Sequence, residues 1–379
     1  MKKALIVASV ASMIDQFNMP FIQLLNELGY EVHIACNFEQ GNTCDDKKIV
    51  QLKQKLFQLG AKSHQIDFDR NVLNLVALRT AMRQMTELLE QEKFALIHCH
   101  SPVGGLVTRI VDRKARKQGT KVIYTAHGFH FYKGAAIKNW LCYYPVEWLC
   151  SFFTDVLITI NLEDYRLARR TMKAKKTVYV PGVGIELNRF KTCPEMRREI
   201  REELKIPDDA VVLLSVGELN ENKNHKVVLE AIKDLDVFYL IVGQGKRKEL
   251  LEKECADLNL TDRVKLLGFR SDIQKIYSCA DIFVFPSYRE GLPVSLMEAM
   301  ASGLPCVVSR IRGNTDLIEE GKGGMLFEPN RSEALKDALR AVLEQDRTVL
   351  GTANQEKMRQ FSLETVLTQM QKIYLNQLQ

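Results

Sequence analysis

Two glutamates in the second half of the chain have the type and spacing of groups that hold a polar ligand. Glu290 and Glu298 are separated by seven residues within SYREGLPVSLMEAMASGLP, residues 287–305. We expect a loop at Glu290, a tight turn over residues 291–293, and a helix that begins near Val294 and carries Glu298 in its second turn. The first N–H groups of such a helix have no partner within it and favour a phosphate. The carboxylates would then accept hydrogen bonds from hydroxyl groups on either side of that phosphate. The alternative is a helix cap and an ordinary surface residue.

Histidines follow or lie within two apolar runs of the first half. His127 comes directly after the predicted strand in KVIYTAHGFHFYKG, at the strand end where parallel sheets bind ligands. By itself a lone histidine is more often a satisfied core residue. His98 and His100 flank Cys99 on another predicted strand, which raises the alternative of a metal site. A metal site needs more converging ligands, so we predict buried strand residues there and no metal.

The elements that position these residues alternate along the whole chain. Short β-branched runs separated by helical patterns indicate parallel sheets built from βαβ units. Helices are expected over Pro20 to Leu28 and Leu73 to Glu92, among others. The runs expected as strands are KALIVASV, YEVHIAC, ALIHCH, KVIYTAH and VLITIN in the first half, and VVLLSVG, FYLIVG, VKLLG, IFVFPS and PCVVS in the second. The sequence therefore predicts an α/β fold with five strands in each of two sheets.

A stretch rich in Gly and Pro, VYVPGVGIELNRF at residues 178–190, is expected to be the linker between two domains. A chain of 379 residues exceeds what one core usually serves. We place a first Rossmann-like domain at residues 1–183, a second at 184–360, and a C-terminal helix at 361–379 that packs back on the first domain. Two doubly wound sheets face a central cleft at their carboxyl ends.

Composition limits the function classes. The first 185 residues hold 25 Lys and Arg against 16 Asp and Glu, whereas the remainder holds 28 against 31. The modest positive charge and the lack of a recognition motif argue against nucleic-acid binding. Nine scattered cysteines without a C-x-x-C pair fit free thiols in a reducing compartment. No apolar run is long enough to span a membrane, and the N-terminal run is too short for a signal peptide, so we expect a cytoplasmic protein.

The glutamate pair, followed by A-M-A-S-G-L-P, resembles the signature of the family-four retaining glycosyltransferases of GT-B architecture. The resemblance continues through VLLSVGELNENKNH at residues 212–225 and covers most of the chain. It implies that Glu290 meets hydroxyls of the transferred sugar, Glu298 binds the ribose of the nucleotide, and Lys223 meets the donor pyrophosphate. Many members have an arginine where this chain has Glu218, and Arg289, Arg310 or Arg312 could replace that charge.

The same resemblance implies the remaining site residues. The segment at Gly268 holds the nucleobase by backbone groups, and His127 lies near the anomeric carbon and the 6-hydroxyl of the sugar. Phe129 and His130 fall on the acceptor side. No cofactor is implied. The full set expected to bind the donor is Gly217, Lys223, Gly268, Phe269, Arg270, Glu290, Gly291, Leu292, Pro293, Val294 and Glu298, with His127, Glu290 and Lys223 as the catalytic members.

An aromatic stretch at residues 140–153, WLCYYPVEWLCSFF, brings Trp140, Tyr144 and Trp148 to one helical face. It is either core or an interfacial helix on an anionic membrane.

The region resembles bacterial capsular and exopolysaccharide glycosyltransferases, whose acceptors are polyprenyl-diphosphate-linked glycans. The resemblance implies a metal-independent, retaining transfer of a hexose or N-acetylhexosamine from a UDP-sugar at the inner face of the cell membrane. The alternatives are an epimerase or hydrolase of the same fold and a non-catalytic nucleotide-sugar-binding subunit.

Overall fold

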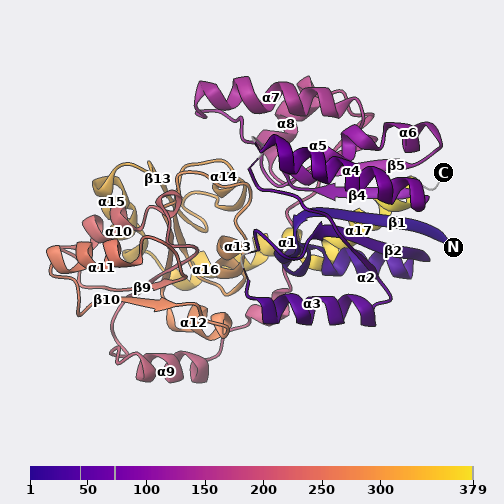
Figure 1. Ribbon diagram of the computed structural model, residues 1–379. Helices are drawn as coiled ribbons and strands as arrows, with labels where there is room; N and C mark the ends of the chain where they lie inside the picture. Colours follow the sequence, from indigo (N-terminus) through magenta and orange to yellow (C-terminus); the bar gives the residue numbers. More distant parts are fainter. Residues whose placement is uncertain (43, 72–73, 378–379) are drawn as a thin grey trace. The chain divides into compact units, whose positions relative to one another are not determined.

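The structure is a computed structural model that describes residues 1–42, 44–71 and 74–377. The chain divides into two compact units: unit 1 comprises residues 1–183 and 366–379, and unit 2 comprises residues 184–365 (Figure 1). Each unit is built on a parallel sheet with helices between successive strands. The α/β fold predicted from the alternating pattern is confirmed.

Within the described part of unit 1 the sheet has seven strands in the order β3-β2-β1-β4-β5-β6-β7. The strands are β1 (Lys2–Val10), β2 (Tyr30–Asn37), β3 (Lys62–Gln65), β4 (Leu96–His100), β5 (Lys121–Ala126), β6 (Val156–Thr159) and β7 (Lys176–Tyr179). The helices are α1 (Ala11–Met13), the π-helical turn η1 (Ile14–Asn18), α2 (Met19–Glu27), α3 (Asp46–Gln58), α4 (Leu75–Gln91), α5 (Pro102–Val111), α6 (Arg113–Lys117), α7 (Ile137–Ser151), α8 (Leu162–Thr171) and α17 (Leu363–Asn376).

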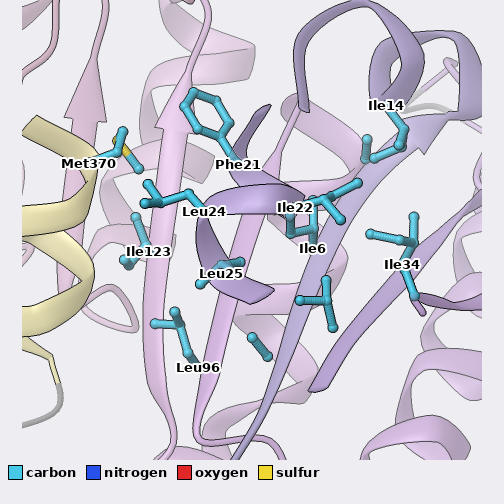
Figure 2. Close-up of a cluster of buried hydrophobic side chains, with 14 of the residues drawn as sticks. Ile6, Ile14, Phe21, Ile22, Leu24, Leu25, Ile34, Leu96, Ile123 and Met370 are labelled. Atoms are coloured by element: carbon cyan, nitrogen blue, oxygen red, sulfur yellow. The ribbon is translucent and has the colours of Figure 1, made fainter. Parts of the chain in front are cut away.

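Both faces of this sheet are covered. Helices α2, α3 and α17 bury apolar residues against one face, and α4, α5 and α8 against the other. Figure 2 shows the first of these layers, in which Met370 of the C-terminal helix points into the same cluster as Phe21, Leu24 and Ile123. The described residues from Val366 onward therefore belong to unit 1 by packing, although all of unit 2 precedes them in the chain.

Unit 2 has a sheet of six described strands in the order β10-β9-β8-β11-β12-β13. The strands are β8 (Val212–Val216), β9 (Phe238–Val242), β10 (Val264–Gly268), β11 (Ile282–Phe285), β12 (Cys306–Ser309) and β13 (Gly324–Phe327). The helices are η2 (Leu187–Phe190), α9 (Pro194–Glu203), η3 (Glu221–Lys223), α10 (His225–Ile232), α11 (Lys248–Asp257), α12 (Ile273–Cys279), α13 (Val294–Ala301), α14 (Asn314–Leu317), α15 (Ser332–Leu343), α16 (Arg347–Met358) and η4 (Arg359–Phe361).

The expectation of five strands in each sheet is wrong by three. Strands β3, β7 and β13 were not predicted, because each has only four residues and lies at an edge of its sheet. A short edge strand pairs on one side and buries little, so it lacks the long β-branched run of a central strand. Strand β7 also occupies Val178 and Tyr179, which were assigned to the linker. The helix expected over residues 73–92 is α4, and Leu73 itself lies outside the described residues.

Candidate active site

The carboxyl end of the unit 2 sheet brings Lys223 and Glu290 together. Lys223 lies in the short turn η3 after β8, and Glu290 lies in the loop after β11, the strand that pairs with β8. Lys223 Nζ is 2.7 Å from Glu290 Oε1, and both side chains are more than four-fifths buried. The ammonium also lies 4.5 Å from the centre of the Phe285 ring. The ion pair with Glu290 and the ring of Phe285 together hold the Lys223 ammonium in place at this edge.

A glycine makes room for that lysine. A Cβ atom placed on Gly217 would lie 2.9 Å from Lys223 Cε, so any side chain there would displace the lysine stem. Gly217 directly follows β8 and donates its N–H to Val242 O of the neighbouring strand β9. Gly217, which was predicted to help bind the sugar donor, therefore leaves the space that the Lys223 side chain occupies.

The loop that carries Glu290 is tied to the lysine turn. Asn222 donates its side-chain amide to Arg289 O at 2.9 Å and approaches Glu290 Oε1 at 3.4 Å. The backbone N–H of Tyr288 donates to Asn222 O. Arg312, which is 9% exposed, donates Nε to Glu290 O at 3.0 Å. Both sides of the Glu290 loop are therefore held by hydrogen bonds from segments far away in the sequence.

Helix α13 begins at Val294, as predicted, directly after the Gly291, Leu292 and Pro293 turn. Pro293 is the N-cap and has no side-chain bond to the helix, so the first N–H groups have no capping side chain. Positive helix-end charge therefore lies in the loop that follows Glu290.

Glu298 lies in the second turn of α13 and is not an ordinary surface residue. Its Oε2 accepts a hydrogen bond from the buried Tyr277 hydroxyl at 2.9 Å. Burial raises the pKa of the Glu298 carboxyl, while the Tyr277 hydrogen bond and the charge of Arg189 oppose that shift. The carboxylate thus has one fixed partner and capacity to accept further hydrogen bonds.

The turn after β10 can contact a ligand chiefly through backbone groups. Gly268 has a left-handed φ of 67°, and Phe269 is 60% exposed. The Arg270 guanidinium is bound to two carboxylates, those of Glu203 and Asp272, at 2.6 to 3.1 Å. Because its side chain is already paired, Arg270 can serve a ligand here chiefly through its main chain.

The carboxyl end of the unit 1 sheet holds the predicted acceptor-side residues. A cavity of about 460 Å³ is lined there by Ser9, Phe17, Ser101, His130 and Tyr143, among others. His130 stacks on Tyr143, with ring centroids 4.7 Å apart. His127 lies beside this cavity, because its ring centroid is 6.1 Å from that of Phe17.

Phe129, in the same loop, lies in the core of unit 1 and not in the lining of this cavity. It is 3% exposed and stacks on Phe131, with ring centroids 4.7 Å apart, within the core of unit 1. Its N–H donates to Asp164 Oδ2 at 2.9 Å, which fixes the loop that carries His127. Its side chain therefore anchors the loop in the core.

Comparisons with known proteins identify the family. Residues 7–161 match the family described as Glycosyl transferase 4-like, and residues 196–362 match Glycosyl transferases group 1. EpsD of Bacillus subtilis (strain 168), a glycosyltransferase by name, is 33% identical, with 98% of this chain and 96% of EpsD covered. The chain belongs to this glycosyltransferase family. The family expected from the sequence is confirmed, and the role of each site residue stays a prediction.

Other relatives of this glycosyltransferase carry specific names. The Escherichia coli UDP-Gal:alpha-D-GlcNAc-diphosphoundecaprenol alpha-1,3-galactosyltransferase is 32% identical, with 71% of each chain covered. Among solved structures, Anabaena Alr3699/HepE in complex with UDP and glucose superposes with a TM-score of 0.78, at 19% identity, over 99% of this chain and 100% of that one. The latter likeness shows the GT-B fold.

Two residues that contact the predicted site were not expected from the sequence of this glycosyltransferase. Tyr277 reaches Glu298, and Asn222 reaches Glu290, from segments whose local pattern reads as a buried helix and a polar turn. Of the arginines considered as replacements at Glu218, Arg310 is paired with Glu320 at 2.8 Å, Arg289 is exposed, and Arg312 contacts the Glu290 loop. Glu218 itself is exposed beside Gly217.

Among residues 1–42, 44–71 and 74–377, no group of three or more His, Cys, Asp or Glu side chains is arranged to hold a metal ion. His98 and His100 are buried strand residues, as predicted. All nine cysteines are described and are free thiols. No helix in the described part of the chain has the length and apolar character needed to cross a membrane.

Proposed function

We propose that this glycosyltransferase moves a hexose or N-acetylhexosamine, with retention of configuration, from a UDP-sugar to a polyprenyl-diphosphate-linked glycan in the synthesis of a bacterial surface polysaccharide. The observation that carries the proposal is the buried Lys223–Glu290 pair at the turn into α13. The names of the E. coli relative, which include UDP-Gal and diphosphoundecaprenol, support the donor and acceptor classes. The UDP and glucose bound to HepE support a uridine nucleotide.

Unit 2 binds the donor in this proposal. Lys223 and the N-terminus of α13 stabilise the negative charge that grows on the departing diphosphate. Glu290 accepts hydrogen bonds from the transferred sugar, and Glu298 accepts them from the ribose. The backbone of Gly268, Phe269 and Arg270 receives the nucleobase. The Arg270 guanidinium, which is already paired with Glu203 and Asp272, is not needed for these roles.

Transfer proceeds without a metal ion and without a covalent intermediate. As the bond between the anomeric carbon and the phosphate oxygen breaks, the acceptor hydroxyl attacks from the same face. The departing phosphate oxygen takes the acceptor proton, so retention needs no protein nucleophile. Lys223 and the helix N-terminus supply the positive charge that a metal would otherwise provide. Binding of the donor must break the Lys223–Glu290 ion pair, which frees each partner for its own ligand group.

Unit 1 receives the acceptor. The cavity of about 460 Å³ at the carboxyl ends of β1 and β4 combines aromatic walls with serine hydroxyls and Arg70. Stacking faces and hydroxyl groups suit a sugar, and an arginine suits a phosphate. His127, beside the cavity, lies near the sugar that is transferred.

A second surface of unit 1 holds the protein on an anionic membrane. Helix α7 forms the outermost layer of unit 1 in Figure 1. Trp140 and Tyr144 pack inward, whereas Ile137, Leu141 and Leu149 are 75%, 70% and 54% exposed. The exposed apolar side chains of α7 and its C-terminus are Ile137, Leu141, Val146, Trp148, Leu149 and Phe152. We name this set the α7 apolar face.

Basic residues adjoin the end of that face. Phe152 and Phe153 line a cavity of about 680 Å³ together with the basic residues Arg113, Lys114, Arg116, Lys117, Lys121 and Lys175. Asp155 is the acidic residue of that lining and pairs with Arg116 and Lys175. An apolar helix face next to clustered cations is the arrangement of a peripheral membrane helix. A lipid-linked acceptor would be reached from such a surface.

The test is a binding panel followed by a transfer assay. Purified protein is heated with UDP, GDP, ADP and several nucleotide sugars, with EDTA present, because a ligand that binds only the native state raises the unfolding temperature. We expect stabilisation by UDP and one UDP-sugar, and α-linked product from that donor with a polyprenyl-diphosphate sugar. Stabilisation without product from any acceptor would favour a non-catalytic subunit. The mechanism would be overturned by a product of inverted configuration. It would also be overturned if the protein formed no product in EDTA and was fully active with an added metal ion.

A further inference from the structure

Three histidines form a row at the carboxyl end of the unit 1 sheet, in which His98 and His100 are buried and His127 is partly exposed. His98 and His100 project from the same face of β4, with ring centroids 4.1 Å apart. His127 follows the adjacent strand β5, and its Nε2 is 3.1 Å from His100 Nδ1. His98 and His100 are each at most 1% exposed. The transfer mechanism above uses His127 alone and leaves the other two without a role.

The inner end of the row is fixed at both ring nitrogens. His98 Nδ1 is 2.8 Å from the Tyr374 hydroxyl, and His98 Nε2 is 2.8 Å from Thr125 Oγ1. Tyr374 comes from α17, so the C-terminal helix fixes the orientation of the His98 ring. His100 packs against that ring and has one bonded nitrogen. Its Nε2 is buried and has no hydrogen-bond partner in the described part of the chain.

Burial keeps all three imidazoles neutral near pH 7. It lowers the pKa of His98 to about 3 and that of His127 to about 4, and it lowers the pKa of His100 well below its usual value. A neutral imidazole carries one N–H and one acceptor nitrogen. The contact between His100 Nδ1 and His127 Nε2 therefore contains one proton, which belongs to one ring or the other.

The unpaired Nε2 of His100 decides between the two arrangements. If the shared proton belongs to His127, His100 must carry its own proton on Nε2, where a buried N–H would have no acceptor. If the proton belongs to His100 Nδ1, His100 Nε2 is only an unpaired acceptor. Buried N–H groups without a partner are rarer than under-satisfied acceptors. The second arrangement is therefore favoured.

We propose that His100 is a positioning residue that donates from Nδ1 to His127 Nε2 and so holds His127 as the tautomer protonated at Nδ1. His127 then presents an N–H donor at the carboxyl edge of unit 1. Its Nδ1 makes no hydrogen bond to any residue that the structure describes, but it is not among the buried atoms that lack a partner, so water or a ligand can accept its proton. A donor there suits an oxygen of the transferred sugar and cannot remove a proton from the acceptor hydroxyl. This consequence for transfer rests on the proposed function, whereas the tautomer does not.

The primary experiment measures the tautomer directly. Full-length protein labelled with ¹⁵N at its seven histidines is examined by long-range ¹H–¹⁵N NMR, and the His127 signals are assigned with His127→Asn. We expect Nδ1 of His127 to be protonated and Nε2 to be bare at pH 7.5. Protonation of His127 at Nε2 would overturn the proposal, and this result needs no variant of His100.

Variants test the origin of that tautomer. His100→Asn keeps an N–H near the position of Nδ1, and His100→Phe removes it. We expect His100→Asn to keep His127 protonated at Nδ1 and His100→Phe to give a mixture of tautomers. His64→Asn is the matched control, because His33 Nδ1 and His64 Nε2 form another histidine pair at 2.9 Å. An unchanged His127 tautomer in His100→Phe would show that His100 does not set it.

Transfer kinetics test the consequence. For His100→Phe we expect kcat to fall on the order of 10- to 100-fold, with a smaller change in KM for the donor, and we expect recovery of most of that loss in His100→Asn. Equal kcat in wild type and His100→Phe would contradict a positioning role. If wild-type protein transfers no sugar at all, the proposed function fails, and the NMR result still decides the role of His100 in setting the tautomer.

Discussion

Lys223 and Glu290 are 67 residues apart in the sequence, and their charged groups meet at 2.7 Å. Each neutralises the other in the absence of a donor, and each has a separate ligand group in the proposed complex. An uncompensated buried charge lowers the stability of a protein. The ion pair therefore lets both charged groups lie in the donor site while no donor is bound. Substitution of one partner should consequently change how the other binds its ligand.

Glu290→Gln should abolish transfer but not nucleotide binding. Loss of the carboxylate removes the contact to the sugar and releases Lys223 from its ion pair. We expect kcat/KM to fall at least about 100-fold, while the Kd for UDP stays the same or tightens and the protein stays folded. Calorimetric titration and a transfer assay check this. Glu221→Gln, whose side chain is 89% exposed on the adjacent turn, is the control and should transfer normally.

Lys223→Ala should weaken the nucleoside diphosphate itself. A charge-assisted hydrogen bond contributes about 1.5 to 3 kcal/mol, which corresponds to a Kd for UDP about 10- to 150-fold higher. Uridine, which has no phosphate, should be unaffected. Lys226→Ala is the control, because Lys226 is half exposed on the next helix and pairs with Glu230 and Glu254. An equal Kd for UDP in wild type and Lys223→Ala would remove Lys223 from the donor site.

Tyr277→Phe should affect the ribose contact through Glu298. The tyrosine hydroxyl lowers the pKa of that carboxyl against the larger effect of burial, so its loss should raise the pKa further. We expect KM for the donor to rise about 2- to 10-fold with little change in kcat. The acid limb of the KM profile should move to higher pH, because the carboxylate form becomes scarcer at a given pH. A profile identical to that of wild type would contradict this role.

The α7 apolar face should bind anionic vesicles. Leu141→Asp with Leu149→Asp removes two exposed apolar side chains from the bilayer contact and should weaken binding to phosphatidylglycerol vesicles more than tenfold. Lys114→Glu with Lys117→Glu should weaken it at least as strongly and reduce its salt dependence. Co-sedimentation measures both pairs.

A matched variant tests whether vesicle binding depends on the α7 apolar face or on any exposed apolar side chain. Val349→Asp changes a 63% exposed aliphatic residue on α16 and should leave vesicle binding intact. Activity on a short-chain, water-soluble acceptor should be equal in wild type and all these variants. Binding of the Leu141→Asp, Leu149→Asp protein at wild-type strength would refute the assigned surface.

Stability should fall on mild acidification because of buried neutral histidines. Burial lowers the pKa of His98 and His225 to about 3 and that of His127 to about 4, from 6.5 when exposed. Between pH 6.5 and about 4 only the unfolded chain binds these protons, so the stability present above pH 6.5 is lost as pH falls. Each histidine contributes up to about 1.4 kcal/mol per pH unit.

Urea unfolding at pH 7.5 and 5.5 measures this loss. We expect His225→Gln to show a shallower dependence on pH than wild type, because one proton fewer binds on unfolding. His225 contacts Tyr239 in the core of unit 2, so its replacement is expected to lower stability at both pH values. Equal free energies of unfolding at the two pH values in wild type would show that these histidines are not neutral in the native state.

Much of this protein could be read from local sequence patterns. The five apolar runs in each half all became strands, of which β10 alone lies at an edge of the described sheets, and the helix beginning at Val294 follows from the turn chemistry of Gly291 and Pro293. These features depend on residues close together in the chain, where periodicity and turn preferences act. The family resemblance at Glu290 and Glu298 was likewise local in the sequence.

Tertiary structure decided what depends on distant partners. The sequence led us to expect that the C-terminal helix packs on the first domain, but only packing showed that α17 places Tyr374 on His98 and that Tyr277 reaches Glu298. The sequence left α7 either core or surface, and folding divided it, with Trp140 inward and Leu141 exposed. The physical reason is the same in each case: a hydrogen bond or a buried face is formed by two segments whose separation along the chain carries no local signal.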